Sequence, residues 1–124
     1  MQILRPQVNG GYSARIVKRG DIMAKRIFEY DEYGPGMGFP SMKLSMLAEP
    51  YEGMGRIVDY LRHGKKTYAA AGKARDFFTG EMIPGEQCGM TDGTYSWNSS
   101  LIYYVEKYNL RLLPEFEEHV LRAG

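Results

Sequence analysis

Glycine and proline divide this chain into short segments. Residues 34–40 read GPGMGFP, and a second punctuated stretch, residues 83–93, contains Pro84 and ends in Asp92-Gly93. Proline lacks a backbone N–H and glycine favours turns, so residues 34–40 cannot form a helix or a central strand. Both stretches are therefore predicted to be loops, and they separate the segments in which regular structure is expected.

The length and composition of the chain are those of one folded domain. A chain of 124 residues can remove roughly two thirds of its unfolded surface from water. The apolar content of 44% gives no signal of disorder. The single cysteine, Cys88, cannot form an internal disulfide, and no segment has the pattern of a signal peptide or a membrane-spanning helix. We expect a cytoplasmic protein that does not contact a membrane.

Charge is distributed unevenly along the chain. Residues 1–26 carry six Lys or Arg against one Asp, whereas residues 76–124 carry three against eight acidic residues. A basic arm of this kind often contacts nucleic acid. The sequence therefore predicts a basic amino-terminal arm on an acidic body.

The native start is either the first methionine or Met23. The codons of Lys18-Arg19-Gly20 can contain a purine run that resembles a bacterial ribosome-binding sequence shortly before Met23. On this hypothesis residues 1–22 are a basic extension, and the rest of the chain carries twelve basic against fourteen acidic residues. The other interpretation is that residues 11–18 form a strand, because their side chains alternate with a period of two. Nucleic acid is expected as a partner only if residues 1–22 are native.

Three segments are predicted to be strands: residues 26–33, which are rich in β-formers, residues 66–74, a strand-length run of small and aromatic residues, and the short segment 94–97. Residues 76–81 and the dipeptide Asp92-Gly93 have turn sequences, so hairpins are expected at both places.

Three segments have the spacing of apolar residues that predicts amphipathic helices. The first covers residues 51–63 and ends at Gly64. The second begins at a cap among residues 98–100 and ends at Asn109 in a left-handed conformation. The third begins at Pro114. The apolar positions expected to face the core are Met54, Ile57, Val58, Leu61, Leu101, Tyr104, Val105, Tyr108, Phe116, Val120 and Leu121.

The order of these elements predicts an α+β fold, a small and mainly antiparallel sheet covered by two or three helices. The second half of the chain has the pattern TDGxYxW, then LxYYVEKY, then LPEF, with DxxTGE upstream. This pattern resembles that of a group of small uncharacterised bacterial proteins, from about Met23 to the end. The resemblance implies a single α+β domain over residues 23–124, favours the later start, and implies no activity.

No stretch of the chain matches a reaction-specific motif. The pairs Gly64-Lys65 and Gly72-Lys73 lack the earlier glycine and the following Ser or Thr of a phosphate-binding loop. Cys88, His63 and His119 show neither a nucleophile–base pattern nor metal-ligand spacing. No catalytic residue, metal or cofactor is predicted, which favours a protein that is not an enzyme.

Aromatic residues near the carboxyl terminus are the best candidates for a binding surface, because Tyr and Trp dominate binding hot spots. Tyr103 is expected to face solvent together with one of Tyr95 or Trp97. If the second helix continues, Tyr103, Lys107 and Arg111 lie four residues apart on one exposed strip. The predicted binding residues are Tyr95, Trp97, Tyr103, Lys107, Arg111, Glu115 and Glu118.

We therefore expect a small bacterial protein that binds another protein and acts by occupying it, as immunity proteins and inhibitors do. The acidic second half would suit a basic partner such as a nuclease. The alternative is a small-molecule or nucleotide binder, or a small enzyme, with a pocket between the loops 34–40 and 85–93. Lys73, Cys88 and Asp92 would contribute to that pocket. The sequence predicts no particular oligomeric state.

Overall fold

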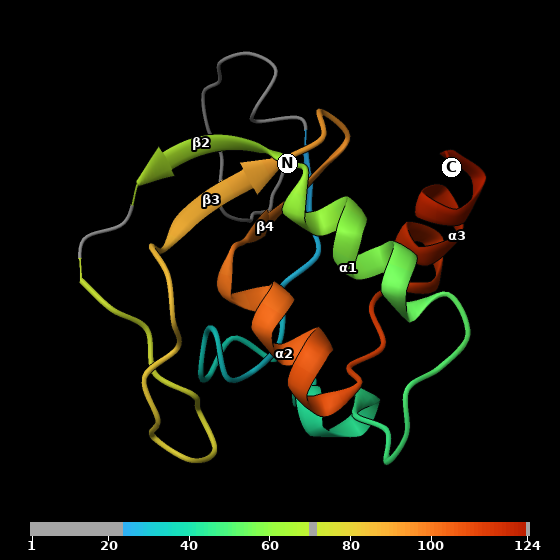
Figure 1. The fold of residues 1–124 in the computed structure, drawn as a ribbon. Coiled ribbons are helices and arrows are strands. Elements are labelled where there is room, and N and C mark those ends of the chain that lie inside the picture. Colours follow the sequence, from blue (N-terminus) through green and yellow to red (C-terminus); the bar gives the residue numbers. More distant parts are fainter. Residues whose placement is uncertain (1–23, 70–71, 124) are drawn as a thin grey trace, which may run out of the picture.

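The computed structural model describes residues 24–69 and 72–123 (Figure 1). The strand expected at residues 11–18, the alternative start at Met23 and the basic extension of residues 1–22 lie outside the described residues. The elements are β1 (Lys25–Arg26), a 3₁₀ helix (Met42–Ser45), α1 (Met54–Arg62), β2 (Lys65–Ala69), β3 (Cys88–Thr91), β4 (Tyr95–Asn98), α2 (Ser100–Tyr108) and α3 (Pro114–Ala123).

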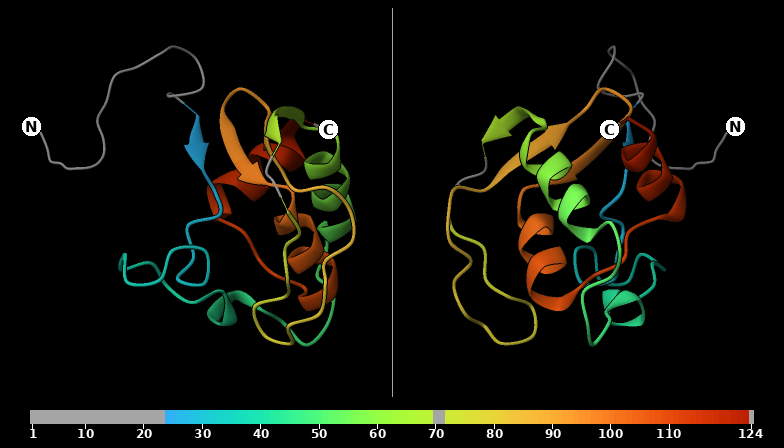
Figure 2. Two further views of the ribbon diagram at one scale, coloured as in Figure 1. Left: turned by 90° about the vertical axis from the view of Figure 1, so that its left-hand side faces the viewer. Right: turned by 45° about the vertical axis from the view of Figure 1, so that its right-hand side comes forward.

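The described strands form one sheet in the order β1-β4-β3-β2. β1 runs parallel to β4, whereas the β4–β3 and β3–β2 pairs are antiparallel. The Asp92-Gly93 turn joins β3 to β4, as predicted. α1 and α3 lie on one side of the sheet, and none of the described helices lies on the other (Figures 1 and 2). The α+β class with a mainly antiparallel sheet is therefore confirmed.

β1 is much shorter than the strand predicted for residues 26–33. Ile27 and Tyr30 are both buried, with 2% and 7% exposure, and a spacing of three does not fit the period of two of a strand. The backbone turns here, because the N–H groups of Tyr33 and Gly34 donate to the Tyr30 carbonyl at 3.0 and 3.3 Å. The prediction of a long first strand was wrong.

β3 lies inside residues 83–93, which were predicted to be a loop. A Cβ atom added at Gly89 would lie 2.3 Å from the ring of Tyr68 on the neighbouring strand. Glycine at this position therefore allows a side chain to approach the backbone closely, which is a second role of glycine within strands. The loop prediction was wrong for residues 88–91. Glycine occurs both in turns and where another group lies close to the backbone of a strand, so its presence does not distinguish the two.

The three predicted helices are present. The N-cap of α2 is Ser99, within the expected range, and the neighbouring Asn98 side chain accepts the N–H of Ser100 at 2.9 Å. Asn109 ends α2 with φ 53° and ψ 43°, the predicted left-handed conformation. Leu121 is 40% exposed instead of buried, because the buried face of α3 is formed by Phe116, Glu117 and Val120. None of the helices described is long and apolar enough to cross a bilayer.

The core between the sheet and the helices is built around Trp97 of β4. Its side chain is 1% exposed, and its Nε1–H donates to the carbonyl of Leu61 in α1 at 3.3 Å. The ring of Phe116 in α3 lies 5.8 Å away, centroid to centroid. A Cβ atom added at Gly64 would lie 2.5 Å from the indole. Gly64 thus follows α1 as predicted and also leaves room for Trp97.

The loop between β2 and β3 contains the turn predicted at residues 76–81. The Asp76 Oδ1 atom accepts the N–H groups of Phe78 and Thr79 at 2.7 and 3.1 Å, an arrangement typical of Asp in turns. The backbone N–H of Asp76 donates to the Glu81 carbonyl at 2.8 Å and closes the turn. This part of the expected hairpin is confirmed.

The same carboxylate fastens the loop to α2. Asp76 is 2% exposed, and its Oδ2 atom accepts the hydroxyl groups of Tyr103 and Tyr108 at 2.7 and 2.6 Å. Lys107 Nζ lies 3.6 Å from the same oxygen. Burial raises the pKa of Asp76, but the hydrogen bonds that the carboxylate accepts outweigh burial and lower the pKa to about 2. The ionised form of Asp76 therefore stabilises the folded state.

We predict that Asp76→Asn destabilises the protein in a pH-dependent way. The pKa of an unfolded Asp is about 3.9, so the stabilisation by Asp76 is complete above that pH and is lost as the pH falls towards about 2. At pH 7 the variant should lose about 2–3 kcal/mol of unfolding free energy in urea. The difference from the unsubstituted protein should shrink as the pH approaches about 2.

Asp59→Asn is the matched control, because the Asp59 side chain is 73% exposed and lies near His63 alone among the charged groups described. It should change the unfolding free energy by less than about 0.5 kcal/mol. An equal loss for Asp76→Asn at both ends of the pH range would contradict the role of the ionised carboxylate.

Candidate functional site

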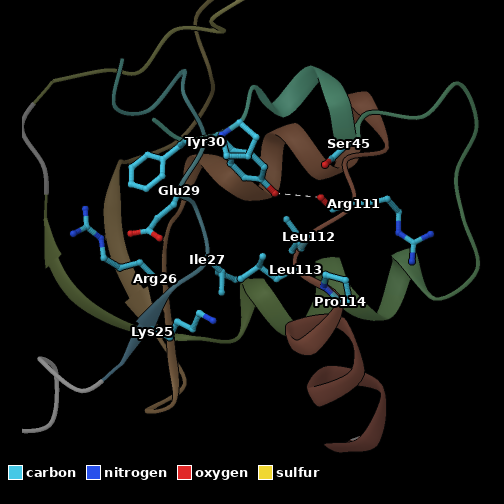
Figure 3. A pocket seen from close by; sticks show the side chains of 12 residues that line it. Lys25, Arg26, Ile27, Glu29, Tyr30, Ser45, Arg111, Leu112, Leu113 and Pro114 are labelled. Carbon is cyan, nitrogen blue, oxygen red and sulfur yellow. Dashed lines mark hydrogen bonds between the residues drawn. The ribbon is translucent and has the colours of Figure 1, made fainter. Parts of the chain in front are cut away.

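A cleft of about 370 Å³ lies between two segments that are far apart in the sequence, residues 25–30 and 111–114 (Figure 3). We call it the β1 cleft. Ile27, Tyr30 and Leu112 form its apolar floor and are 2–7% exposed. The Tyr30 hydroxyl donates to the Arg111 carbonyl at 3.2 Å and so joins the two walls, as the dashed line in Figure 3 shows. The other residues that line it are Lys25, Arg26, Glu29, Phe39, Pro40, Ser45, Leu113 and Pro114.

The ends of the β1 cleft are held by ion pairs. Lys25 Nζ lies 3.1 Å from Glu115 at the start of α3. Arg111 makes two hydrogen bonds to Glu117, at 3.0 and 2.5 Å, and its guanidinium carbon lies 4.3 Å from the ring centroid of Tyr51. The hydrogen bonds to Glu117 raise the pKa of Arg111. Two of the three cations that line the cleft are therefore neutralised in place, and Arg26 is the one without a carboxylate partner among the described residues.

Among the described strands, β1 is the edge of the sheet beside the β1 cleft, and one side of its backbone is not paired with another strand. The N–H groups of Lys25 and Ile27 donate to the carbonyls of Thr94 and Ser96 in β4, at 2.9 and 3.0 Å. Neighbouring residues of a strand direct their backbone groups to opposite sides, so the N–H and C=O of Arg26 point away from β4. Arg26 lines the cleft, and among the described strands β1 pairs with β4 alone.

A second polar cluster holds the turn between β3 and β4. The Asp92 Oδ2 atom accepts the Tyr60 hydroxyl at 2.5 Å and lies 3.0 Å from His119 Nε2. Its Oδ1 atom accepts the N–H groups of Thr94 and Tyr95 at 2.8 and 2.7 Å. Burial raises the pKa of Asp92, but these hydrogen bonds outweigh burial and lower it. The cluster joins the turn to α1 and α3, so Asp92 has a structural role.

The structure buries two of the aromatic residues predicted to bind. Tyr95 and Trp97 are 8% and 1% exposed, because alternate residues of β4 point the same way, towards the helices. The ring of Tyr95 packs 5.1 Å from that of Phe116. The expectation that one of the two faces solvent was therefore wrong. Tyr103 is half-buried and donates to Asp76.

The exposed strip of Tyr103, Lys107 and Arg111 does not form. Lys107 Nζ does lie 3.1 Å from the Tyr103 hydroxyl. However, α2 ends at Tyr108 and Asn109 reverses the chain, so Arg111 lies beside the β1 cleft instead. The condition for the strip, a second helix that continues past Asn109, is therefore not met.

The predicted acidic residues are paired within the chain. Glu115 bonds Lys25, and Glu118 lies 2.9 Å from Arg122 on the same helix. The acidic second half is therefore partly neutralised by basic residues, including one from the other end of the chain.

The residues of the alternative pocket line neither the β1 cleft nor the cleft beside α2 that contains Glu86 and Gln87. Lys73 is exposed, Cys88 is buried in β3, and Asp92 holds the turn. Phe39 and Pro40 line the β1 cleft. Glu86 and Gln87 line a different cleft of about 310 Å³ beside α2. Within residues 24–69 and 72–123, no three His, Cys, Asp or Glu side chains are grouped so that they could hold a metal ion.

Comparisons of the chain with models of known protein families, with curated proteins and with solved structures found no match. The resemblance to small bacterial proteins therefore stays a prediction. Sequence reasoning did not find the β1 cleft, although it placed Arg111 in a binding surface. Its floor residues Ile27, Tyr30 and Leu112 look like ordinary core residues, and no local signal indicates that their segments meet.

We predict that Glu117→Gln, beside the wall of the β1 cleft, lowers the free energy of unfolding whereas Glu118→Gln leaves it nearly unchanged. Glu117 accepts two hydrogen bonds from Arg111 and a third from the N–H of Leu112, and its side chain is 9% exposed. The loss should be about 1–3 kcal/mol of unfolding free energy, measured by Trp97 fluorescence in urea. Glu118 carries the same group one residue further on, but it is 70% exposed. Its replacement should cost less than about 0.5 kcal/mol, and equal losses would contradict this account.

Proposed function

We propose that this chain is a protein-binding module that takes an extended segment of its partner into the β1 cleft. The observation that carries this proposal is the edge of β1 that no other described strand pairs, beside an apolar floor. Exposed edges of this kind accept an added strand, in which main-chain hydrogen bonds supply affinity and pockets for alternate side chains supply specificity.

The cleft defines the chemistry of the segment that would fit. The N–H and C=O of Arg26 would pair with the main chain of the incoming strand, next to β1 in the sheet. One apolar side chain of that strand would rest on Ile27, Tyr30 and Leu112, and its neighbours would point away. Lys25 and Arg111 are already paired with carboxylates, so an acidic residue of the segment would be favoured only beside Arg26.

The mode of action would be that expected from the sequence. A small protein that holds a segment of its partner acts by occupying it, as immunity proteins and inhibitors do. The pairing of Glu115 and Glu117 removes the reason to expect a basic partner at this site. Shape, apolar contact and main-chain hydrogen bonds support the recognition instead.

A small-molecule ligand is the second candidate, and the size of the β1 cleft favours it. A volume of about 370 Å³ lies in the range of known ligand pockets, roughly 300–1,000 Å³. A small molecule would use the apolar floor but would not need a repeating main chain. The two candidates therefore differ in whether a peptide backbone is required.

We predict that short random peptides displayed on phage are enriched by the immobilised full-length protein, with apolar residues at alternate positions. Leu113→Glu should abolish the enrichment, because Leu113 lines the cleft and is only 37% exposed. Leu121→Glu is the matched control, since Leu121 is 40% exposed and lies outside the cleft. Lack of enrichment, or enrichment that Leu113→Glu leaves intact, would overturn the proposal.

We further predict that N-methylation of an enriched peptide weakens binding at one amide and not at the next, as expected for an added strand. Methylation of the one amide that pairs with Arg26 should weaken binding by about tenfold, because it removes a hydrogen bond and blocks close approach of the strands. Methylation of the next amide, which points to the other side, should change affinity by less than about threefold. Equal tolerance at both positions, measured by fluorescence anisotropy, would favour recognition of side chains alone.

A further inference from the structure

The surface of the sheet that faces away from α1 and α3 is polar and basic. We call it the outer face. The strand register places Arg26, Ser96, Thr91 and Lys65 in one row across the sheet. The adjacent row contains Met90 and Trp97, whose side chains are buried against the helices. Because successive residues of a strand point to opposite faces, the row from Arg26 to Lys65 lies on the outer face.

An exposed aromatic ring stands on the same face. Asn98, Gly89 and Tyr68 are paired two residues further along the strands. The Tyr68 ring covers the position that a Gly89 side chain would take, which places the ring on the outer face. Tyr68 is nevertheless 58% exposed. Gly89 therefore positions the ring of Tyr68 and leaves much of it in contact with solvent.

Some cations of the described chain are paired with a carboxylate, and the two of this face are among those that are not. Lys25, Arg62, Lys107, Arg111 and Arg122 each lie within salt-bridge distance of a Glu. Arg26 and Lys65 are exposed, and among the described residues neither is paired with a carboxylate. The two outer-face rows contain no acidic residue. The outer face thus carries positive charge that no described carboxylate neutralises.

We infer that the outer face binds single-stranded nucleic acid. Lys65 and Arg26 at the two ends of the row contact backbone phosphates, and the exposed ring of Tyr68 stacks on a base. Basic groups that follow the backbone, combined with aromatic rings that accept bases, are the features by which single strands are bound without strong sequence preference. Ser96 and Thr91 between the two cations add short polar side chains.

This inference does not depend on residues 1–22, on which the expectation of nucleic-acid binding rested. It is also independent of the proposed protein-binding function. Arg26 lies at the border of the β1 cleft and the outer face, so it cannot separate the two activities. Lys65 and Tyr68 do not line the β1 cleft and test the outer face alone.

The experiment measures binding of fluorescein-labelled oligouridine to the full-length protein by anisotropy at several salt concentrations. Tyr68→Ala should weaken binding by about tenfold, whereas Tyr68→Phe, which keeps the ring, should stay within about threefold. Lys65→Ala should reduce the slope of log affinity against log salt by about 0.7, the value for one phosphate on a single strand. Lys43→Ala, an exposed lysine outside the sheet, is the control and should leave the slope unchanged.

Two competitors decide whether the recognition is of a single strand. A duplex of the same length should compete at least about tenfold more weakly, because its bases are not open to Tyr68. Polyglutamate should also compete weakly, because it has charge but no bases. The inference is overturned if Tyr68→Ala and Lys65→Ala both bind like the unsubstituted protein, or if polyglutamate competes as well as oligouridine.

Discussion

A carboxylate can be buried only if hydrogen-bond donors replace the water it loses, and three such carboxylates fix the loops of this protein. Asp76 holds the β2–β3 loop to α2, and Asp92 holds the β3–β4 turn to α1 and α3. Glu117 holds residues 111–114 beside the start of α3. The strands are two to five residues long, so backbone pairing alone fixes little of the chain. Hydrogen bonds to a charged acceptor are stronger than neutral ones, and the position of the β1 cleft wall depends on one such group.

The same requirement explains where the tyrosines of this chain are used. Their hydroxyl groups are the donors that the buried acceptors need: Tyr60 serves Asp92, and Tyr103 and Tyr108 serve Asp76. From the sequence, an aromatic residue of a helix can thus be taken for part of a binding surface, although in the structure its hydroxyl group bonds an internal carboxylate. Groups left without an internal partner are the better guides to function. In the part of the chain that the structure describes, these groups include the outer edge of β1, the cations of the outer face and the exposed ring on β2.

Features that depend on neighbouring residues could be predicted from the sequence, and features that depend on distant contacts could not. The left-handed Asn109, the proline that begins α3 and the Asp-Gly turn each follow from local backbone preferences, and all three were found. β3 was missed because Gly89 is required by a distant contact: the ring of Tyr68, about twenty residues earlier in the chain, occupies the position of its missing side chain. The β1 cleft was missed because it too depends on contacts between segments that are far apart in the sequence. Its walls, residues 25–30 and 111–114, meet only after the sheet and α3 have formed.

The two proposed surfaces share one boundary, and this has a geometric consequence. A strand added beside β1 continues the sheet, so its alternate side chains stand in the same rows as Arg26 and Ser96 on the outer face. An acidic side chain there would neutralise Arg26 and weaken a phosphate contact, and a basic one would extend the positive row. Lys65 and Tyr68, at the opposite edge of the sheet, would be affected much less, because exposed charges are screened over about 8–10 Å at physiological salt. The order β1-β4-β3-β2 thus sets how far a bound partner segment influences the outer face.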